Sequence, residues 1–156
     1  MLRTSLTTIL LTFGMVLAMT GAVQAQEIPD ITLAQLEDLV SQSKGKVLVV
    51  DFFATWCPPC RQEIPGFVEL QKKYSAQGLS IVGISVDEGP VNAVQNFAKE
   101  MGINYQLYHD TGQIARKYRI RAIPTTYVYD KAGNKVKTHI GFVSPEEFDK
   151  QVSALL

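Results

Sequence analysis

The sequence predicts one α/β domain built on a central mixed β-sheet, with helices covering both faces of the sheet. Helix-like segments alternate with short apolar runs along most of the chain, which then ends in two strand-like runs and a last helix. The runs at residues 47–53 and 79–86 are almost continuously apolar, which is typical of strands buried on both faces. A length of 156 residues suits a single domain, and no repeat, low-complexity tract or interdomain linker interrupts it.

The first 25 residues have the composition of a targeting segment. Arg3 is the only charge among them, residues 9–18 are nearly all apolar, and the small residues Val23 and Ala25 stand where an export peptidase reads. We therefore expect a signal peptide over residues 1–25 and a mature domain over residues 26–156. An uncleaved membrane anchor is the alternative, although the apolar run is shorter than the roughly 20 residues that a membrane span needs.

The domain is expected to begin with a helix, followed by the first buried strand. Thr32 can cap this helix, with Gln35 three residues later as its capping-box partner. The strand at residues 47–53 comes next. A long helix is predicted over residues 58–77, and Pro65 should kink it because the proline ring clashes with the carbonyl group four residues earlier.

The second half of the chain continues the alternation of strands and helices. The apolar periodicity predicts a strand, a helix, a strand and a helix, in that order, at residues 79–86, 90–101, 105–108 and 112–118. Strands at residues 125–129 and 135–140 are joined by a short turn with Gly and Asn, which predicts a hairpin. The last helix should start at Ser144, with Pro145 at its first position and Glu147 as the capping-box partner.

The chain has two cysteines, Cys57 and Cys60, three positions apart. A disulfide between them closes too short a loop to stabilise the fold, so redox chemistry is the better interpretation of the pair. A structural zinc site needs four ligands, and His109 and His139 are far away in the sequence, so no metal is expected. Covalent haem attachment needs a histidine after the second cysteine, and Arg61 stands there instead.

The predicted helix after the strand at residues 47–53 makes the two thiols unequal. Cys57 lies at the helix N-terminus, where unpaired N–H groups and the helix dipole favour a thiolate, and we expect it to be exposed. Cys60 should point inward and stay protonated. Cys57 then attacks a substrate disulfide, and Cys60 resolves the mixed disulfide. Pro58 and Pro59 have no N–H group to stabilise the thiolate and bring no positive charge, which predicts a reducing couple.

Several segments together resemble the TlpA/ResA-like branch of the thioredoxin superfamily. They are Val50 to Pro65 with Trp56-Cys57-Pro58-Pro59-Cys60, then residues 82–87, 118–120 and 122–126. The resemblance spans about residues 31–156 and implies a thioredoxin-like fold and a thiol–disulfide oxidoreductase with no cofactor besides the redox-active Cys57–Cys60 disulfide. It also implies a cis peptide bond between Ile123 and Pro124, facing the cysteines and exposing backbone for an extended substrate segment. A trans proline that opens an edge strand is the alternative.

Three further residues are candidates for roles beside the cysteines. Asp51 matches the buried carboxylate of classical thioredoxins, at a position where many TlpA-like proteins carry an uncharged residue. Burial should raise its pKa so that it takes the proton of Cys60, and the alternative is a polar strand residue with local hydrogen bonds. Glu63 matches the position of a functional glutamate in the resembled ResA-like proteins. We expect its charge to raise the cysteine pKa values by repulsion, and the alternative is a solvated surface residue. Trp56 flanks the thiols as an apolar docking surface for substrate, or else packs in the core.

These features predict a periplasmic, monomeric thiol:disulfide oxidoreductase that reduces disulfide-containing exported proteins. The resemblance implies a membrane-embedded thiol reductant as its partner, and the balanced net charge gives no reason to expect nucleic acid binding. A thiol peroxidase of related fold, a cytochrome c maturation thioredoxin and a non-catalytic binding module are the alternatives. The cytochrome-maturation pattern Gly-Ala-Pro-Glu-Thr is absent, since Ala122-Ile123-Pro124-Thr125-Thr126 stands there. A solvated surface is expected for the basic cluster Arg116, Lys117, Arg119 and Arg121.

Overall fold

The computed structural model describes residues 27–156, and the signal peptide predicted over residues 1–25 lies outside the described residues. Within them, the strands form a six-stranded sheet in the order β1-β4-β3-β2-β5-β6. The strands are β1 (Asp30–Ile31), β2 (Val47–Phe53), β3 (Leu79–Ser85), β4 (Gln106–Asp110), β5 (Thr125–Tyr129) and β6 (Lys135–Ile140). The first four are mutually parallel, whereas β5 and β6 are antiparallel to their neighbours. The predicted mixed sheet is confirmed.

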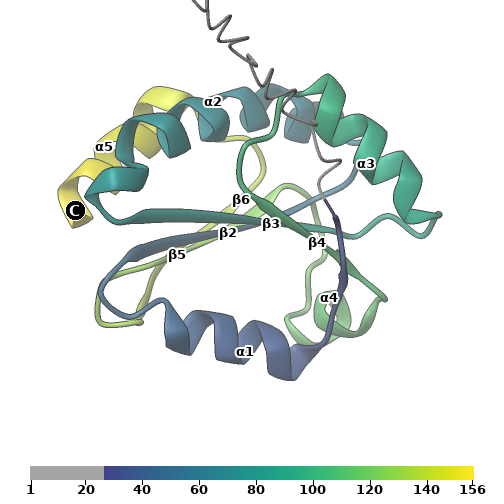
Figure 1. Cartoon of the computed structure of the whole chain (residues 1–156), viewed down its shortest axis with the longest axis horizontal. Helices are drawn as coiled ribbons and strands as arrows, with labels where there is room; N and C mark the ends of the chain where they lie inside the picture. Colours follow the sequence, from purple (N-terminus) through teal and green to yellow (C-terminus); the bar gives the residue numbers. More distant parts are fainter. Residues whose placement is uncertain (1–26) are drawn as a thin grey trace, which may run out of the picture.

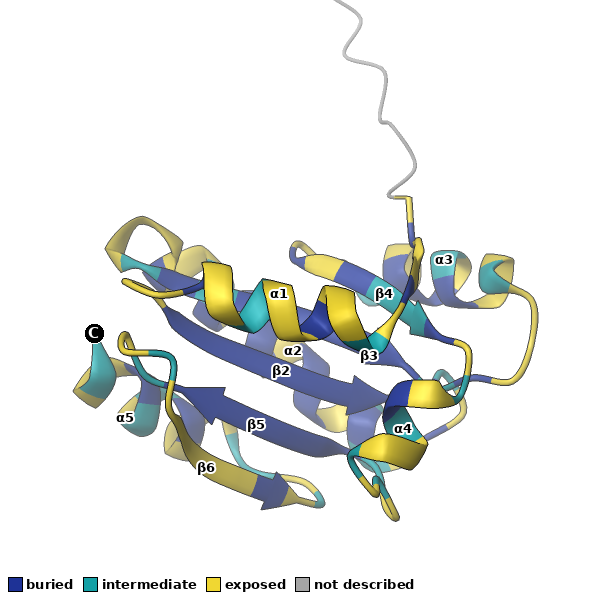
Figure 2. Ribbon diagram, turned by 90° about the horizontal axis from the view of Figure 1, so that it is seen from below, coloured by how far each residue is buried: buried dark blue, intermediate teal, exposed yellow. Residues whose placement is uncertain are grey.

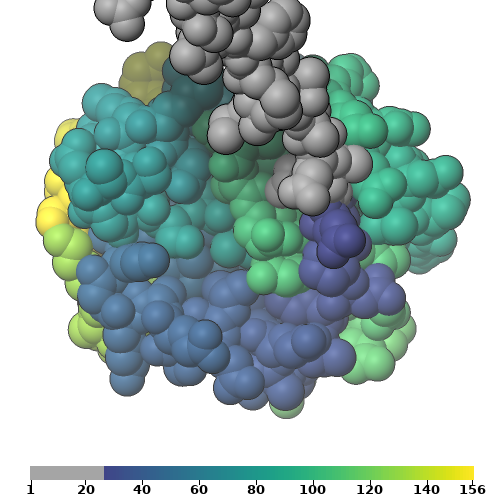
Figure 3. All heavy atoms as spheres, viewed as in Figure 1, coloured from purple at the N-terminus to yellow at the C-terminus, as the bar shows by residue number. Residues whose placement is uncertain are grey.

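Helices cover both faces of the sheet (Figure 1). They are α1 (Leu33–Gln42), α2 (Pro58–Tyr74), α3 (Val91–Glu100), α4 (Gln113–Lys117) and α5 (Pro145–Leu155). Helices α2, α3 and α5 lie on one face, and α1 and α4 lie on the other. In the same view drawn as spheres, the side chains of α1 form the lower side of the molecule and those of α2 the upper left (Figure 3). None of the helices described over residues 27–156 combines the length and the apolar composition of a membrane span.

Strand β2 is the central strand and is buried along its whole length (Figure 2). Because successive side chains of a strand point to opposite faces, Val49 and Phe53 join the core under α2, whereas Val50 and Phe52 join the core over α1. The same alternation directs Asp51 to the α2 face. A carboxyl group therefore lies inside the layer into which the helix of the two cysteines packs.

Local signals placed several elements correctly. The bounds of β2, β5 and β6 agree with the predicted strands. The capping box of α1 is confirmed, since Thr32 Oγ1 accepts from the Gln35 N–H at 3.3 Å and Gln35 Oε1 accepts from the Thr32 N–H at 2.8 Å. Ser144 caps α5 by accepting from the Glu147 N–H at 3.3 Å.

Other elements differ from the prediction. The helix predicted to reach residue 77 ends at Tyr74, and a 3₁₀ turn, Ser75–Gln77, leads to Gly78, which has a φ of 98° that favours glycine. Strand β4 extends to Asp110 rather than residue 108 because its last residues pair with β1. No sequence pattern predicted β1, because a strand of two residues is too short to show a periodic pattern.

Candidate active site

The two cysteines lie where β2 passes into α2. A turn over residues 54–57 connects the two elements, and the Cys57 N–H closes it by donating to the Ala54 carbonyl at 3.2 Å. Cys57 is the N-cap of α2, and Pro58 follows in the first turn, where a missing N–H costs no helical hydrogen bond. The sequence therefore places a sulfur atom at the positive end of the helix dipole, as predicted.

Cys57 and Cys60 form a disulfide, with 5.3 Å between their Cα atoms. The Cys57 sulfur also accepts a hydrogen bond from the Cys60 N–H at 3.3 Å. Cys60 is fully buried, as predicted, but Cys57 is only 2 % exposed, so the expectation of an exposed Cys57 is wrong for this oxidised state. The reason is that the bonded sulfur lies over the first turn of α2 instead of projecting into solvent.

The Ile123–Pro124 peptide bond is cis, which confirms the prediction and excludes the trans alternative. Pro124 directly precedes β5, and the antiparallel pairing of Phe52 with Thr125 brings it to the end of β2 from which the chain runs to Cys57. The Pro124 carbonyl accepts from the Gly141 N–H at 2.8 Å. The cis proline is therefore tied to the segment that follows β6.

Two carboxyl groups are buried beneath the cysteines. Asp51 on β2 is fully buried and Glu63 on α2 is 2 % exposed, which excludes the solvated surface position for Glu63. The Thr126 hydroxyl donates to Asp51 Oδ1 at 3.2 Å, and the Val143 N–H donates to Glu63 Oε1 at 2.9 Å. Among the described residues, the second oxygen of each carboxyl group has no hydrogen-bond partner.

This environment favours the protonated carboxyl groups. Burial raises the pKa of Asp51 well above its usual value, and the neighbouring Glu63 carboxylate raises it further against the opposing hydrogen bond from Thr126. Burial likewise raises the pKa of Glu63 to about 7, although the Val143 N–H and the nearby Thr126 hydroxyl lower it. The pair can therefore hold a proton near neutral pH inside the layer into which the helix of the two cysteines packs.

Apolar residues beside the cysteines and the cis proline in the sequence reach the protein surface. Trp56 is 68 % exposed, which excludes core packing for its side chain. Pro58 is exposed, whereas Pro59 and Ile123 are half-buried. These four apolar side chains are thus at least partly accessible, and their role in docking a substrate stays a prediction.

Sequence reasoning missed the segment after β6. Ile140 and Phe142 are exposed and flank Gly141, which bonds to Pro124, while Val143 bonds to Glu63. This segment thus connects the cis proline to a buried carboxyl group. Two exposed apolar residues at a strand end were a visible signal, but their place at the site depends on the pairing of Ile140 with Thr125, which no local pattern predicts.

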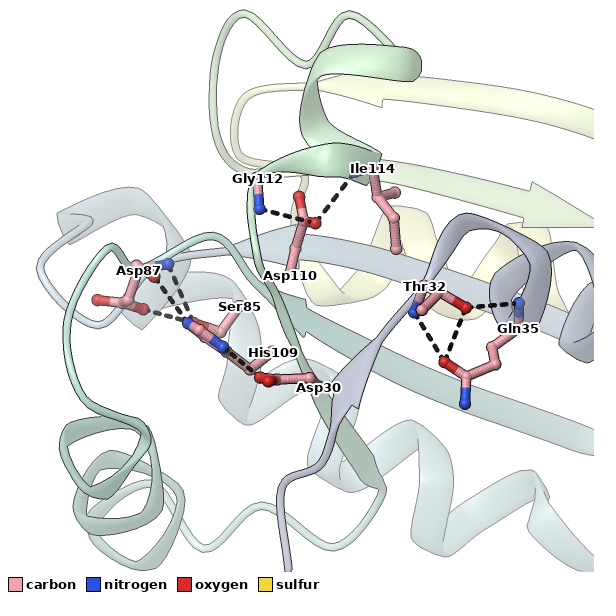
Figure 4. Close-up of polar contacts among 9 residues, drawn as sticks. All are labelled: Asp30, Thr32, Gln35, Ser85, Asp87, His109, Asp110, Gly112 and Ile114. Atoms are coloured by element: carbon pink, nitrogen blue, oxygen red, sulfur yellow. Dashed lines mark hydrogen bonds and ion pairs between the residues drawn. The ribbon is translucent and has the colours of Figure 1, made fainter.

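Each histidine bonds to groups other than the cysteines. His109 on β4 bonds through its ring nitrogens to Asp30 Oδ1 at 2.8 Å and to the Asp87 carbonyl at 2.9 Å (Figure 4). His139 on β6 bonds to Gln151 Oε1 at 2.8 Å. No group of three or more potential metal ligands was found in residues 27–156. The basic cluster is exposed, as predicted, at Arg116, Lys117, Arg119 and Arg121.

Comparison with known proteins adds to this picture. The model of the AhpC/TSA family matches residues 24–138. Thioredoxin-like protein YneN of Bacillus subtilis is 31 % identical over 137 residues, which cover 85 % of this chain and 80 % of that protein. Thiol-disulfide oxidoreductase ResA of Bacillus thuringiensis is 33 % identical over 128 residues, which cover 80 % of this chain and 73 % of ResA.

The fold also matches solved structures. A thiol:disulfide interchange protein of the thioredoxin family from Chlorobium tepidum superposes with a TM-score of 0.68 at 38 % identity, covering 74 % of this chain and 83 % of that one. The predicted thioredoxin-like fold is confirmed by this match together with the mixed sheet and its covering helices.

Proposed function

Because the chain belongs to the AhpC/TSA family, and within it to the ResA-like thiol–disulfide oxidoreductases of the thioredoxin superfamily, we propose that it reduces disulfide bonds of exported proteins in the periplasm. The observation that carries the proposal is the Cys57–Cys60 disulfide at the N-terminus of α2. The two sulfurs carry the electrons, so the reaction needs no other cofactor.

The reaction has two exchange steps that conserve electrons. In the reduced protein the Cys57 thiolate attacks a substrate disulfide, so one substrate sulfur leaves as a thiolate and a mixed disulfide forms. Cys60 then attacks the Cys57 sulfur, which releases the second substrate thiolate and leaves the Cys57–Cys60 disulfide. The helix N-terminus and the Cys60 N–H, which bonds to the Cys57 sulfur in the oxidised state, stabilise the attacking thiolate.

The second step requires Cys60 to lose its proton inside the protein. Asp51 is the buried base proposed for this step, because a carboxyl group with a raised pKa accepts a proton from a thiol more readily than an ordinary carboxylate does. Glu63 acts on Asp51 by repulsion and helps to keep its pKa high. Its negative charge also disfavours the thiolates, which raises the cysteine pKa values.

The sequence between the cysteines favours the reducing direction. Pro58 and Pro59 supply neither an N–H donor nor a positive charge to the Cys57 thiolate, so the reduced form is weakly stabilised and donates its electrons readily. Equilibration with glutathione should give a potential well below that of the strong oxidants. A value on the order of −120 mV would overturn the proposed direction.

The substrate is proposed to bind along the cis-proline segment. An extended peptide can pair with the backbone at Ile123 in the manner of an added strand, while Trp56 and Pro58 offer exposed apolar contacts beside the disulfide. The exposed Ile140 and Phe142 extend this apolar surface because Gly141 between them bonds to Pro124. Substrates with apolar residues near their cysteines fit this surface.

The location rests on the first residues of the chain. The charge, apolar stretch and small residues of residues 1–25 support export by cleavage after Ala25, and a periplasmic protein of this chemistry needs a membrane-embedded thiol reductant to restore Cys57 and Cys60. Cell fractionation and N-terminal sequencing test the location. Recovery of the full-length chain from the cytoplasm would contradict it.

Trapping of substrates tests the function itself. Cys60→Ser removes the resolving thiol, so exported proteins should accumulate on Cys57 as mixed disulfides that mass spectrometry identifies. Cys57→Ser is the matched control, because it keeps one thiol but removes the attacking one, and it should trap nothing. Equal trapping by both variants, or trapping by neither, contradicts the proposal. Rapid consumption of hydrogen peroxide by the reduced wild-type protein would instead favour the thiol peroxidase alternative.

A further inference from the structure

The turn that delivers Cys57 to α2 is held by two oppositely charged side chains from outside the turn. The Asp87 carboxylate, just beyond β3, accepts from the Thr55 hydroxyl at 2.6 Å and from the Thr55 N–H at 3.1 Å and 3.3 Å. From α2, Arg61 Nη1 donates to the Thr55 carbonyl at 3.2 Å. All the polar groups of Thr55 are therefore bound by a carboxylate on one side and a guanidinium on the other.

We call these contacts of Thr55 with Asp87 and Arg61 the clamp, and its carboxylate side is fixed. Asp87 is buried, and its Oδ2 also accepts from the Ser85 hydroxyl at 2.7 Å, while the Asp87 N–H donates to the Ser85 oxygen at 3.2 Å. The Asp87 carbonyl is bonded to His109, as the close-up of this corner shows (Figure 4). Bonds through its side chain and both backbone groups leave Asp87 little freedom to move.

The guanidinium side is fixed as well. The guanidinium of Arg61 lies over the ring of Phe97 on α3, with 5.0 Å from its central carbon to the ring centroid. Arg61 also forms an ion pair with Glu100, which lies on α3 as well. Phe97 is part of the buried core under α3. Arg61 thus links α2, α3 and the turn before Cys57, and its planar fork suits several simultaneous contacts.

We propose that Asp87 and Arg61 act through Thr55 as positioning residues for Cys57. Apart from these bonds, the Cys57 N–H donates to the Ala54 carbonyl at 3.2 Å, and the Cys57 carbonyl accepts from the Arg61 N–H at 3.1 Å in the first turn of α2. In the oxidised protein the disulfide also holds Cys57, but that bond is broken in the reduced protein, which is the state that attacks substrate. The clamp therefore matters most when Cys57 is a thiolate and must stay at the helix N-terminus to remain stabilised.

Thr55→Val tests the clamp without changing any charge, and Thr55→Ser is its matched control because serine keeps the hydroxyl. In reduced protein that also carries Cys60→Ser, the pH dependence of alkylation by iodoacetamide reports the pKa of Cys57. We expect Thr55→Val to raise this pKa. In protein with both cysteines, it should lower kcat/KM for insulin reduction about tenfold, mainly through kcat. Thr55→Ser should restore both values.

Arg61→Gln tests the clamp from the other side, at a half-exposed position where the substitution leaves the core intact. It should also raise the pKa of Cys57 and lower kcat. Lys73→Gln is the matched control, since it removes one positive charge and one surface ion pair, with Asp149, far from the turn. Glu100→Gln removes one of the contacts that hold Arg61 but spares the bond from Arg61 to Thr55, so it should change both values in the same direction and by less.

The proposal rests on the exchange activity, but the two can fail separately. If the wild-type protein does not reduce insulin, the proposed function is contradicted, while the alkylation profile still reports the clamp. If Thr55→Val and Arg61→Gln alkylate with the wild-type pH dependence and show unchanged kcat, the clamp is overturned. Lower thermal stability with unchanged reactivity also overturns it, because it shows that these bonds serve folding alone.

Discussion

Two buried aspartates on opposite sides of the sheet have opposite surroundings. Asp110, beside α4, accepts the backbone N–H groups of Gly112 and Ile114 at 3.0 Å (Figure 4). It also accepts the Ala115 N–H at 2.7 Å. Asp51, under α2, accepts the Thr126 hydroxyl, and its other oxygen has no hydrogen-bond partner among the described residues. Similar burial thus gives a carboxylate that organises a helix start in one place and a carboxyl group that favours its proton in the other.

The difference extends to the layers around these residues. The core between the sheet and helices α1 and α4 consists of apolar and tyrosine side chains, with Phe52 at its centre. The layer under α2 holds the disulfide, Asp51 and Glu63 among its apolar side chains. We infer that one layer supplies stability while the other gives up some stability to keep groups that can exchange protons and electrons.

The largest effect is expected in the apolar layer. Phe52 is fully buried, and its ring lies 5.6 Å from that of Tyr127, so Phe52→Ala should lower the free energy of unfolding by about 4 kcal/mol through lost burial and a new cavity. Urea unfolding measures the loss. Phe142→Ala, at an exposed position, should change stability by less than about 0.5 kcal/mol. If Phe52→Ala also shifted the reduction potential, the two layers would not be separable.

Glu63→Gln should instead raise the free energy of unfolding, by an amount that depends on pH. The carboxyl pKa is 4.5 in the free side chain and about 7 in the folded protein, so between these values the folded state binds more protons and wild-type stability falls as pH rises. Across this pH range the wild-type protein should lose about 3 kcal/mol of unfolding free energy. Gln keeps an acceptor for the Val143 N–H but carries no proton to lose.

Urea unfolding across this pH range measures the prediction for Glu63. The variant should be more stable than the wild type above about pH 7 and closest to it near about pH 4, because the penalty appears only when Glu63 ionises. Glu69→Gln, an exposed carboxylate on the same helix, is the control and should follow the wild-type curve. Parallel curves for Glu63→Gln and the wild type would show that Glu63 does not carry the buried proton.

Asp51→Asn should affect the chemistry more than the fold. It keeps the shape of the side chain but cannot take the Cys60 proton, so resolution of a preformed mixed disulfide on Cys57 should slow about a hundredfold near neutral pH. Rapid-quench analysis measures this step separately from the first attack. The deficit should shrink at high pH, where hydroxide removes the proton. A resolution rate equal to that of Asp149→Asn, a surface control, would remove Asp51 from the mechanism.

Local sequence patterns predicted the parts of the site that depend on neighbours along the chain. The position of Cys57 after β2 and the cap of α1 by Thr32 follow from residues within a few positions of each other. The cis bond before Pro124 came from the family resemblance, because base rates alone favour trans.

The missed features depend on contacts that join distant parts of the chain. Asp87 reaches Thr55 across 32 positions, and Val143 reaches Glu63 across 80. Cys57 is buried in the disulfide-bonded protein, and no local pattern predicts that burial. The partners of a polar side chain, unlike its place on a helix or strand, are set by tertiary packing.

The smallest effect expected is at Asp110, and its sign tests the comparison most directly. Asp110→Ala removes the acceptor of three backbone N–H groups at the start of α4 and should lower the free energy of unfolding by about 2 kcal/mol. Asp110→Asn keeps one acceptor oxygen, so it should cost about half as much. Asp51→Asn should instead raise stability at neutral pH, since the raised pKa of Asp51 makes its ionised form costly in the folded state. Urea unfolding at one neutral pH compares the three variants. If Asp110→Asn and Asp51→Asn shifted stability in the same direction, the hydrogen bonds around each aspartate would not decide its energetic role.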